Sequence, residues 1–219
     1  MTDINKKQLE TYSRMLLEWN EKMNLTAITN PEEVQIKHFE DSLLLLEHLD
    51  IKQNASVIDV GTGAGFPGLV LKIARPDLKV TLLDSLNKRL IFLKAVCDEI
   101  GVEVDLIHSR AEDAGRDEKC RAAFDYAVSR AVSALPALCE YCLPLIKTGG
   151  VMAAMKGPEM NEELNNAMDA IKLLGGGEVQ KKEYTLPNGD GRSLVTIKKI
   201  SQTPTKYPRK GVKISKTPL

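Results

Sequence analysis

Apolar and polar residues alternate with a helical period in the N-terminal part of the chain. From Asn5 to Met23, apolar side chains recur three or four residues apart, at Leu9, Tyr12, Met15, Leu16 and Trp19. This spacing predicts an amphipathic helix with one buried stripe. Asn30 as an N-cap and Pro31 in the first turn predict a second helix, which continues to about His48.

After residue 54 the pattern changes to short apolar runs that alternate with helical segments. The apolar runs predict strands at Ser56–Val60, Lys79–Asp84, Glu103–His108, Phe124–Ser129 and Val151–Lys156. Helical patterns lie at Pro67–Ala74, Leu86–Ile100, Ala134–Leu145 and Glu159–Leu174. Two late strands, Val179–Leu186 and Ser193–Ile200, flank a turn rich in glycine and predict a hairpin.

Repeated strand–helix units are typical of α/β proteins with a parallel sheet. We therefore predict a Rossmann-like, mostly parallel twisted sheet with an antiparallel closing strand and a helical N-terminal cap. The predicted segments are a helical extension at 1–54, the α/β domain at 55–200 and a basic tail of irregular chain at 201–219.

Charge is balanced over the whole chain but not along it. The 219 residues carry 30 basic and 30 acidic side chains. From Lys198 to the end every charged side chain is basic, which fits either an anionic partner or a solvated chain end. The chain has no signal-peptide pattern and no apolar run long enough to span a membrane, so we expect a soluble, cytoplasmic protein, by default a monomer.

The cysteines and histidines do not predict a metal site. Cys139 and Cys142 form a single CxxC pattern inside a helical apolar segment. Two small apolar side chains on one helix face explain this spacing better than a zinc site, which needs further ligands. The three histidines are scattered along the chain.

A glycine-rich loop follows the first predicted strand, and the next strand ends in Asp84. A glycine loop and a carboxylate at the same sheet edge are typical of nucleotide-type cofactor sites. The stretch from Gly63 to Gly68 formally matches the dinucleotide pattern GxGxxG. The strand ends at Val60, however, so the turn begins at Gly61, and the third dinucleotide position becomes Phe66, where a small residue is needed.

Read from Asp59, the loop has the pattern Asp-x-Gly-x-Gly-x-Gly. It resembles the first motif of class I S-adenosylmethionine-dependent methyltransferases. Gly61 and Gly63 would let backbone groups approach the amino-acid end of that cofactor, and Asp59 suits its ammonium directly or through water. Asp84 suits the ribose hydroxyls in either cofactor class.

Two further segments concern the adenine ring and the methyl acceptor. In methyltransferases the loop after the third strand lies beside the adenine, which makes Ala111 and Glu112 candidates, although this acidic loop alone also fits a helix start. After the fourth strand, amino-group methyltransferases carry an Asn/Asp-Pro-Pro-aromatic motif, whereas this chain has Ser129-Arg130-Ala131. Cytosine-C5 enzymes need a cysteine nucleophile, and Cys139 and Cys142 lie inside a predicted helix. Neither mechanism is indicated.

A set of short segments carries a more specific resemblance: Trp19-Asn20, Asn24-Leu25-Thr26, His38 with Asp41-Ser42, the loop from Asp59 to Gly68, Leu83-Asp84-Ser85, Lys88-Arg89, Phe92-Leu93, Arg110-Ala111-Glu112, Phe124-Asp125, Ser129-Arg130-Ala131, Lys156-Gly157 and the end from Tyr207. With these the chain resembles the RsmG (GidB) family, bacterial methyltransferases that modify guanine N7 in small-subunit ribosomal RNA. The resemblance implies S-adenosylmethionine as cofactor and 16S ribosomal RNA, free or in the small subunit, as partner. It implies cofactor contacts at Gly61, Phe66, Ala111, Glu112 and Arg130.

The implied reaction agrees with the absence of a catalytic motif. Guanine N7 carries a lone pair and no proton, so it can attack a sulfonium methyl group without a general base, and we predict no catalytic acid or base. The base must leave its stack to react. We predict RNA contacts from Lys156, Arg192, Tyr207, Arg209 and Lys216. His38 and Asp41, three residues apart, either line the acceptor site or form a structural hydrogen bond.

Two other interpretations stay open on the sequence alone. One is an NAD-dependent dehydrogenase, which would bind NADH and not S-adenosylhomocysteine. The other is a non-catalytic RNA-binding protein with a methyltransferase fold. The intact loop from Asp59 to Gly65, together with Asp84, argues against the second interpretation.

Overall fold

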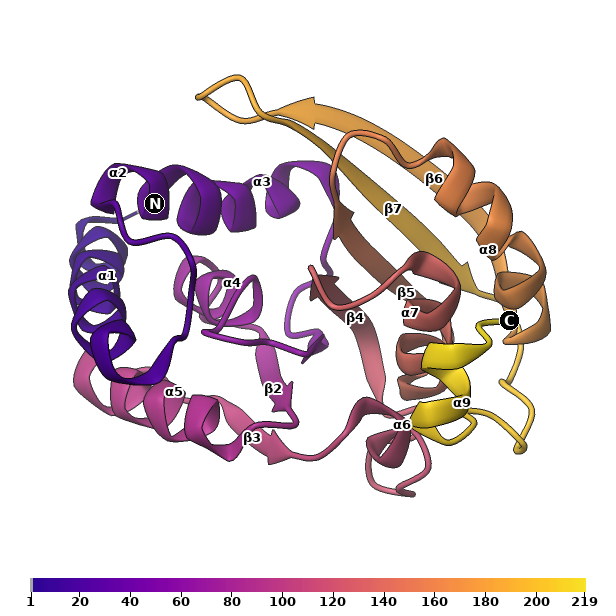
Figure 1. Ribbon diagram of the computed structural model, residues 1–219. Helices are drawn as coiled ribbons and strands as arrows, with labels where there is room; N and C mark the ends of the chain where they lie inside the picture. Colours follow the sequence, from indigo (N-terminus) through magenta and orange to yellow (C-terminus); the bar gives the residue numbers. More distant parts are fainter. Residues whose placement is uncertain (1) are drawn as a thin grey trace.

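A seven-stranded sheet forms the centre of the protein, with helices on both faces (Figure 1). The computed structural model describes residues 2–219. Across the sheet the strands are β3 (Asp105–His108), β2 (Lys79–Asp84), β1 (Ser56–Val60), β4 (Phe124–Arg130), β5 (Ile146–Lys156), β7 (Gly191–Lys199) and β6 (Gly176–Thr185). The pairs from β3 to β5 are parallel, and β7 is antiparallel to both neighbours. The predicted α/β fold and its closing hairpin are confirmed.

Buried side chains of the sheet alternate between two apolar cores. In β1, Val57 belongs to the first core and Ile58 to the second. Helices α4 (Gly68–Ala74) and α5 (Asn87–Ile100) cover the first face, whereas α7 (Leu135–Cys142) and α8 (Asn161–Leu173) cover the second. The connections change direction between β1 and β4, and such a switch point is where open α/β sheets bind ligands.

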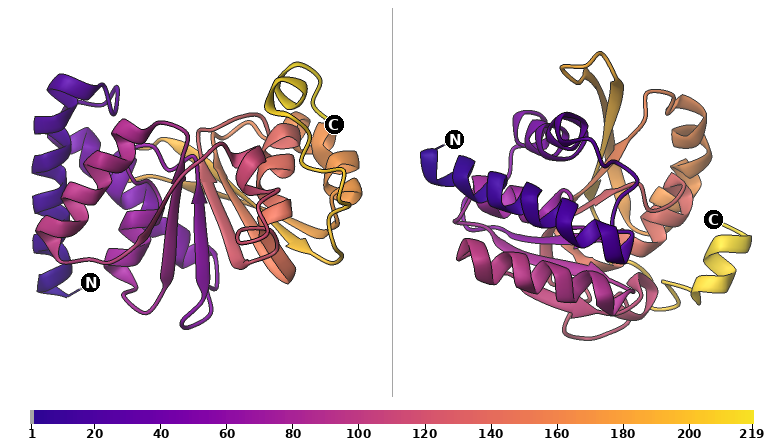
Figure 2. Two further views of the ribbon diagram at one scale, coloured as in Figure 1. Left: turned by 90° about the horizontal axis from the view of Figure 1, so that it is seen from below. Right: turned by 60° about the vertical axis from the view of Figure 1, so that its left-hand side comes forward.

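The N-terminal helices pack against the first face beside α4 and α5 (Figure 2). The stripe predicted for the first helix is buried on α1 (Asp3–Met23), with Leu9, Tyr12 and Leu16 in the first core. The second predicted helix forms as α2 (Pro31–Val34), a π-helical segment η1 (Gln35–Glu40) and α3 (Asp41–His48). Its N-cap is confirmed, because the Asn30 side chain accepts hydrogen bonds from the amides at the start of α2.

The C-terminal segment and several boundaries differ from the predictions. The tail was expected to be irregular, but it contains α9 (Gly211–Lys216), and the acidic loop after β3 forms α6 (Ala111–Ala114). Helix α7 ends at Cys142, and a 3-10 turn, η2 (Leu143–Leu145), follows because Pro144 lacks the amide that would continue the helix. Strand β5 begins at Ile146, five residues before its predicted start at Val151, since Ile146 pairs with Phe124.

Candidate functional site

The glycine loop turns at Gly61 immediately after β1, which confirms its predicted register. Gly61 and Gly63 have φ angles of +71° and +61°, in the left-handed region that favours glycine. The Gly61 amide donates to the Leu83 carbonyl at 2.9 Å and so ties the loop to β2. A Cβ atom on Gly61 would lie 2.6 Å from Cγ2 of Val132, so the segment after β4 packs directly on this glycine.

Asp59 is fully buried below the loop. Its Oδ2 accepts hydrogen bonds from the Thr62 hydroxyl at 2.7 Å and the Gly68 amide at 2.8 Å, which joins β1, the loop and α4. Its Oδ1 has no hydrogen-bond partner among residues 2–219. Burial raises the pKa of Asp59 to about 6, against the opposing effect of the two hydrogen bonds. A cation near Oδ1 would stabilise the charged carboxylate.

Asp84 ends β2 beside the loop with its carboxylate held in place. Its Oδ2 accepts from the Gly63 amide at 2.9 Å and from Nη1 of Arg89 at 3.2 Å. Its Oδ1 accepts from the Leu86 amide at 2.8 Å. Oδ1 keeps a further lone pair, so the carboxylate can also accept a hydrogen bond from a ligand hydroxyl.

A cavity of about 430 Å³, here called the loop cavity, opens at this end of the sheet. Its lining includes the loop at Gly61, the β2 end at Asp84 and Ser85, the start of α6 at Ala111 and Glu112, and the segment Ala131 to Ser133. Four of the residues predicted to contact the cofactor line it: Gly61, Asp84, Ala111 and Glu112. Sequence reasoning missed Val132, Tyr141 and Ser215, for which no motif gave a signal.

Two side chains predicted to contact the cofactor, Phe66 and Arg130, lie elsewhere. The Phe66 ring is buried between Tyr12 and His38, with ring centroids 5.4 and 4.5 Å away and nearly parallel planes. The Arg130 guanidinium lies 5.2 Å from the Phe66 ring and is bound to Asp41. The apolar ring and the buried ion pair explain why neither side chain lines the loop cavity. Gly63 does not line it either, since its amide is bound to Asp84.

A second cavity of about 280 Å³ is lined by four basic side chains, and we call it the cationic cavity. The basic residues are Lys37, Arg130, Lys156 and Arg192. His38, Asp41 and Met155 also line it. This surface suits a nucleotide, which combines an anionic phosphate with a flat, hydrogen-bonding base.

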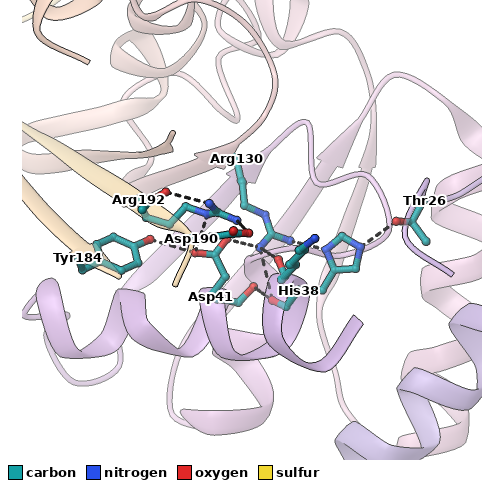
Figure 3. A network of polar contacts seen from close by, with 10 residues as sticks. Thr26, His38, Asp41, Arg130, Tyr184, Asp190 and Arg192 are labelled. Carbon is teal, nitrogen blue, oxygen red and sulfur yellow. Dashed lines mark hydrogen bonds and ion pairs between the residues drawn. The ribbon is translucent and has the colours of Figure 1, made fainter. Parts of the chain in front are cut away.

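Several polar residues of the cationic cavity form one network with their neighbours (Figure 3). The Asp41 carboxylate accepts hydrogen bonds from Nη1 of Arg130 at 2.8 Å and the Tyr184 hydroxyl at 3.1 Å, and Nε of Arg192 lies 3.8 Å away. Both residues left open by the sequence, His38 and Asp41, line the cavity. Arg130 joins them, because its Nη2 lies 3.3 Å from Nδ1 of His38.

His38 is neutral at pH 7 in this network. Burial and the nearby Arg130 charge lower its pKa to about 4. Its Nε2 lies 2.8 Å from the hydroxyl of Thr26, in the loop before α2, so Thr26 and Arg130 together hold both ring nitrogens in place. A neutral, fixed imidazole does not add positive charge next to a ligand.

Two predicted RNA-binding residues line the cationic cavity but are already paired. Nζ of Lys156 donates to the Ser133 carbonyl at 2.6 Å and to Glu163 at 2.5 Å. Nη2 of Arg192 lies 3.7 Å from the Asp190 carboxylate, and its Nη1 donates to the Gly191 carbonyl. Both keep part of their surface at the cavity, so they remain candidates for RNA contact.

Two of the three tail residues predicted to contact RNA are held against the domain. Tyr207 is buried in the second core and cannot stack on a base without leaving it. Arg209 forms an ion pair at 2.7 Å with Glu140, whose side chain is 0% exposed. Lys216 is exposed and remains a prediction.

The remaining sequence features give no further chemistry. Cys139 and Cys142 are buried on α7, where burial raises the pKa of both thiols, as expected for apolar packing residues. Within residues 2–219, no group of three or more His, Cys, Asp or Glu side chains is arranged to hold a metal ion. In the same range, no helix combines the length and the apolar character that a membrane span requires.

The two cavities adjoin each other at Ala131, which lines both. Ala131 has φ of +57°, and the chain crosses there from Arg130 in the cationic cavity to Val132 in the loop cavity. The loop cavity offers the backbone of Gly61 and two carboxylates, and the cationic cavity offers four basic side chains. The arrangement can bring a cofactor and a nucleotide substrate together on either side of one residue.

Sequence comparisons show that the chain is similar to known proteins over nearly all of its length. A family model described as GidB, rRNA small subunit methyltransferase G, matches residues 5–189. Ribosomal RNA small subunit methyltransferase G of Alkaliphilus metalliredigens is 55% identical over 219 residues, which are 99% of this chain and 92% of that protein. The protein of the same name from Lactococcus lactis subsp. lactis is 47% identical, over 100% of this chain and 93% of that protein.

Several solved structures have a similar fold. TrmN from Thermus thermophilus matches 73% of this chain and 48% of its own, with a TM-score of 0.57 and 18% identity. An rRNA methylase from Streptococcus thermophilus matches 74% of this chain and 95% of its own, with a TM-score of 0.52 and 19% identity. At these identities the likeness shows the fold alone.

Proposed function

The chain belongs to the GidB family of small-subunit rRNA methyltransferases, and from this premise we propose that it methylates N7 of a guanine in 16S ribosomal RNA. The methyl donor is S-adenosylmethionine. The observation that carries the proposal is the pair of cavities on either side of Ala131. We assign the loop cavity to the cofactor and the cationic cavity to the target nucleotide.

The residues of the loop cavity fit the cofactor. A volume of about 430 Å³ lies within the range of small-molecule sites. Oδ1 of Asp84 has a free lone pair for a ribose hydroxyl, and Glu112 can accept a hydrogen bond from the adenine amino group. The unpaired Oδ1 of Asp59 suits the cofactor's ammonium through water, since Asp59 does not itself line the cavity. A dinucleotide site is disfavoured, because Phe66 fills the position that would need a small residue.

The cofactor supplies an electrophilic methyl group on a sulfonium. The protein's task is then to hold guanine with N7 about 3–3.5 Å from that group and to keep water out. No side chain must remove a proton, because N7 carries none. The neutral state of His38 fits this chemistry, since the methylated ring becomes cationic and a charged imidazole beside it would be unfavourable.

The cationic cavity supports binding of a nucleotide that has left its stack. Arg130 and Arg192 are held by Asp41, so their guanidinium groups are oriented before RNA binds. Lys37 lies at the same cavity with its ammonium paired only to Glu33 on the surface. We assign these cations, with the exposed Lys216, to phosphate contacts that strengthen binding and make it depend on salt.

A ribosomal substrate would locate the protein in the cytoplasm, and we propose that a monomer is the active form. The residues of a single chain form both cavities. Light scattering during turnover checks this point, and activity confined to a dimer fraction would refute it.

The proposal is tested by binding and by transfer. Calorimetry should detect binding of S-adenosylhomocysteine and no binding of NADH. The reverse result would restore the dehydrogenase interpretation. Tritium from methyl-labelled S-adenosylmethionine should enter 16S RNA or small subunits taken from cells that lack the enzyme. Cofactor and RNA binding without any transfer would indicate the non-catalytic alternative.

A further inference from the structure

The end of the chain folds across α6 and α7 at the side of the loop cavity (Figure 1). We call residues 203–216 the C-terminal strap. Its side chains Thr203, Tyr207 and Ile214 are buried, and Tyr207 belongs to the second core. The basic residues of the strap at positions 206, 210, 213 and 216 are exposed. The strap therefore has a packed inner side and a basic outer side.

Two arginines fasten the strap to the domain. Arg209 donates from Nε and Nη2 to the Glu140 carboxylate of α7, at 2.9 and 2.7 Å, and its backbone amide donates to the same group at 2.6 Å. Arg121 donates to the carbonyls of Thr203 and Tyr207, at 2.7 and 2.8 Å. The buried carboxylate and the bound carbonyls fix the backbone on both sides of Tyr207.

The strap reaches the loop cavity at two points. Ser215 of α9 is one of the cavity's lining residues. The backbone at Gly211 lies against the Glu112 carboxylate, so a Cβ atom there would collide with Oε1 of Glu112. Gly211 is not in the left-handed region of φ, so the contact with Glu112 is the constraint that a larger residue would meet at this position.

We propose that the C-terminal strap is a wall of the cofactor site and holds Glu112 in position to accept a hydrogen bond from the adenine amino group. The proposal rests on the proposed function, since it takes the loop cavity as the cofactor site. A glutamate on an uncovered helix would lose side-chain freedom when the cofactor binds. The strap confines that side chain in the free protein, and so the cofactor does not have to order it.

The first test places a large side chain at the residue of α9 that lines the loop cavity. Ser215→Phe would project a ring into the loop cavity and should weaken S-adenosylhomocysteine binding, measured by calorimetry, about tenfold or more. Val212→Phe is the matched control, because Val212 is 69% exposed on the same helix and does not line that cavity. Circular dichroism melts confirm that both variants fold. Equal affinities for the two variants would overturn the proposal.

The second test addresses Glu112. Gly211→Ala should weaken S-adenosylhomocysteine binding about tenfold, because it displaces the Glu112 carboxylate, which accepts a hydrogen bond from the adenine amino group. In a Glu112→Ala background the same change should have no further effect, since the added methyl group has room. Equal losses in both backgrounds would overturn the role of Glu112. If the wild-type protein bound no S-adenosylhomocysteine, the cofactor assignment itself would fail, whereas wild-type affinity in Gly211→Ala would overturn only the strap.

Discussion

Arg209→Ala should destabilise the protein by about 3 kcal/mol, because it leaves a buried carboxylate without its cation. The Glu140 side chain is 0% exposed and accepts hydrogen bonds from the Arg209 guanidinium and amide. Breaking a buried ion pair by removing one partner costs about 3–5 kcal/mol. The hydrogen bond from the backbone amide of residue 209 to Glu140 survives the substitution, which favours the lower end of that range. About 3 kcal/mol is a large part of a typical stability of 5–15 kcal/mol.

Urea denaturation followed by circular dichroism measures this loss. Lys210→Ala is the matched control, since Lys210 is exposed and its removal should change stability by less than about 0.5 kcal/mol. Replacing both partners, with Glu140→Leu and Arg209→Met together, should recover most of the loss, because no charge is then buried. A loss below about 1 kcal/mol for Arg209→Ala would refute the reasoning, since Glu140 would then be reached by water.

Three more predictions concern the two cavities. Gly61→Ala should weaken S-adenosylhomocysteine binding far more than Gly63→Ala in calorimetry, because only the first collides with Val132 while both have positive φ; equal losses would mean that backbone strain alone matters. Burial raises the pKa of Asp59 from 3.8 to about 6, so this group's stabilising contribution is present below pH 4 and falls by about 3 kcal/mol as pH rises through 6. Urea titrations from pH 4 to 7 should show this fall in the free energy of unfolding for the wild type and not for Asp59→Asn. The same pH dependence in both proteins would contradict the prediction. Arg192→Ala should weaken 16S RNA binding, lower its salt slope by about one and spare S-adenosylhomocysteine binding, and an unchanged slope would exclude a phosphate contact.

The sequence predicts the site best where its chemistry is local. The end of β1 and the glycine at the turn lie side by side in the chain, so the register at Gly61 could be read directly. The position of Asp84 follows as well, because parallel strands end at the same sheet edge. Both residues depend on the strand pattern, which apolar periodicity reveals.

The sequence predicts the site least where a partner lies far away along the chain. Arg209 was predicted to contact RNA, because its partner Glu140 is 69 residues distant and no local pattern links them. Arg130 looked like a cofactor or phosphate ligand, but Asp41 of the N-terminal helices binds it. The short helix α9 was missed because segments of this length depend on tertiary packing more than on propensity.

The central claim is most directly tested by the identity of the methylated nucleoside. We would digest 16S RNA from cells that lack the enzyme, after incubation with the protein and S-adenosylmethionine, and analyse the nucleosides by mass spectrometry against standards. The account predicts that 7-methylguanosine appears, at one residue per molecule of RNA. New methylation at N1 or N2 of guanine, or on another base, would contradict it.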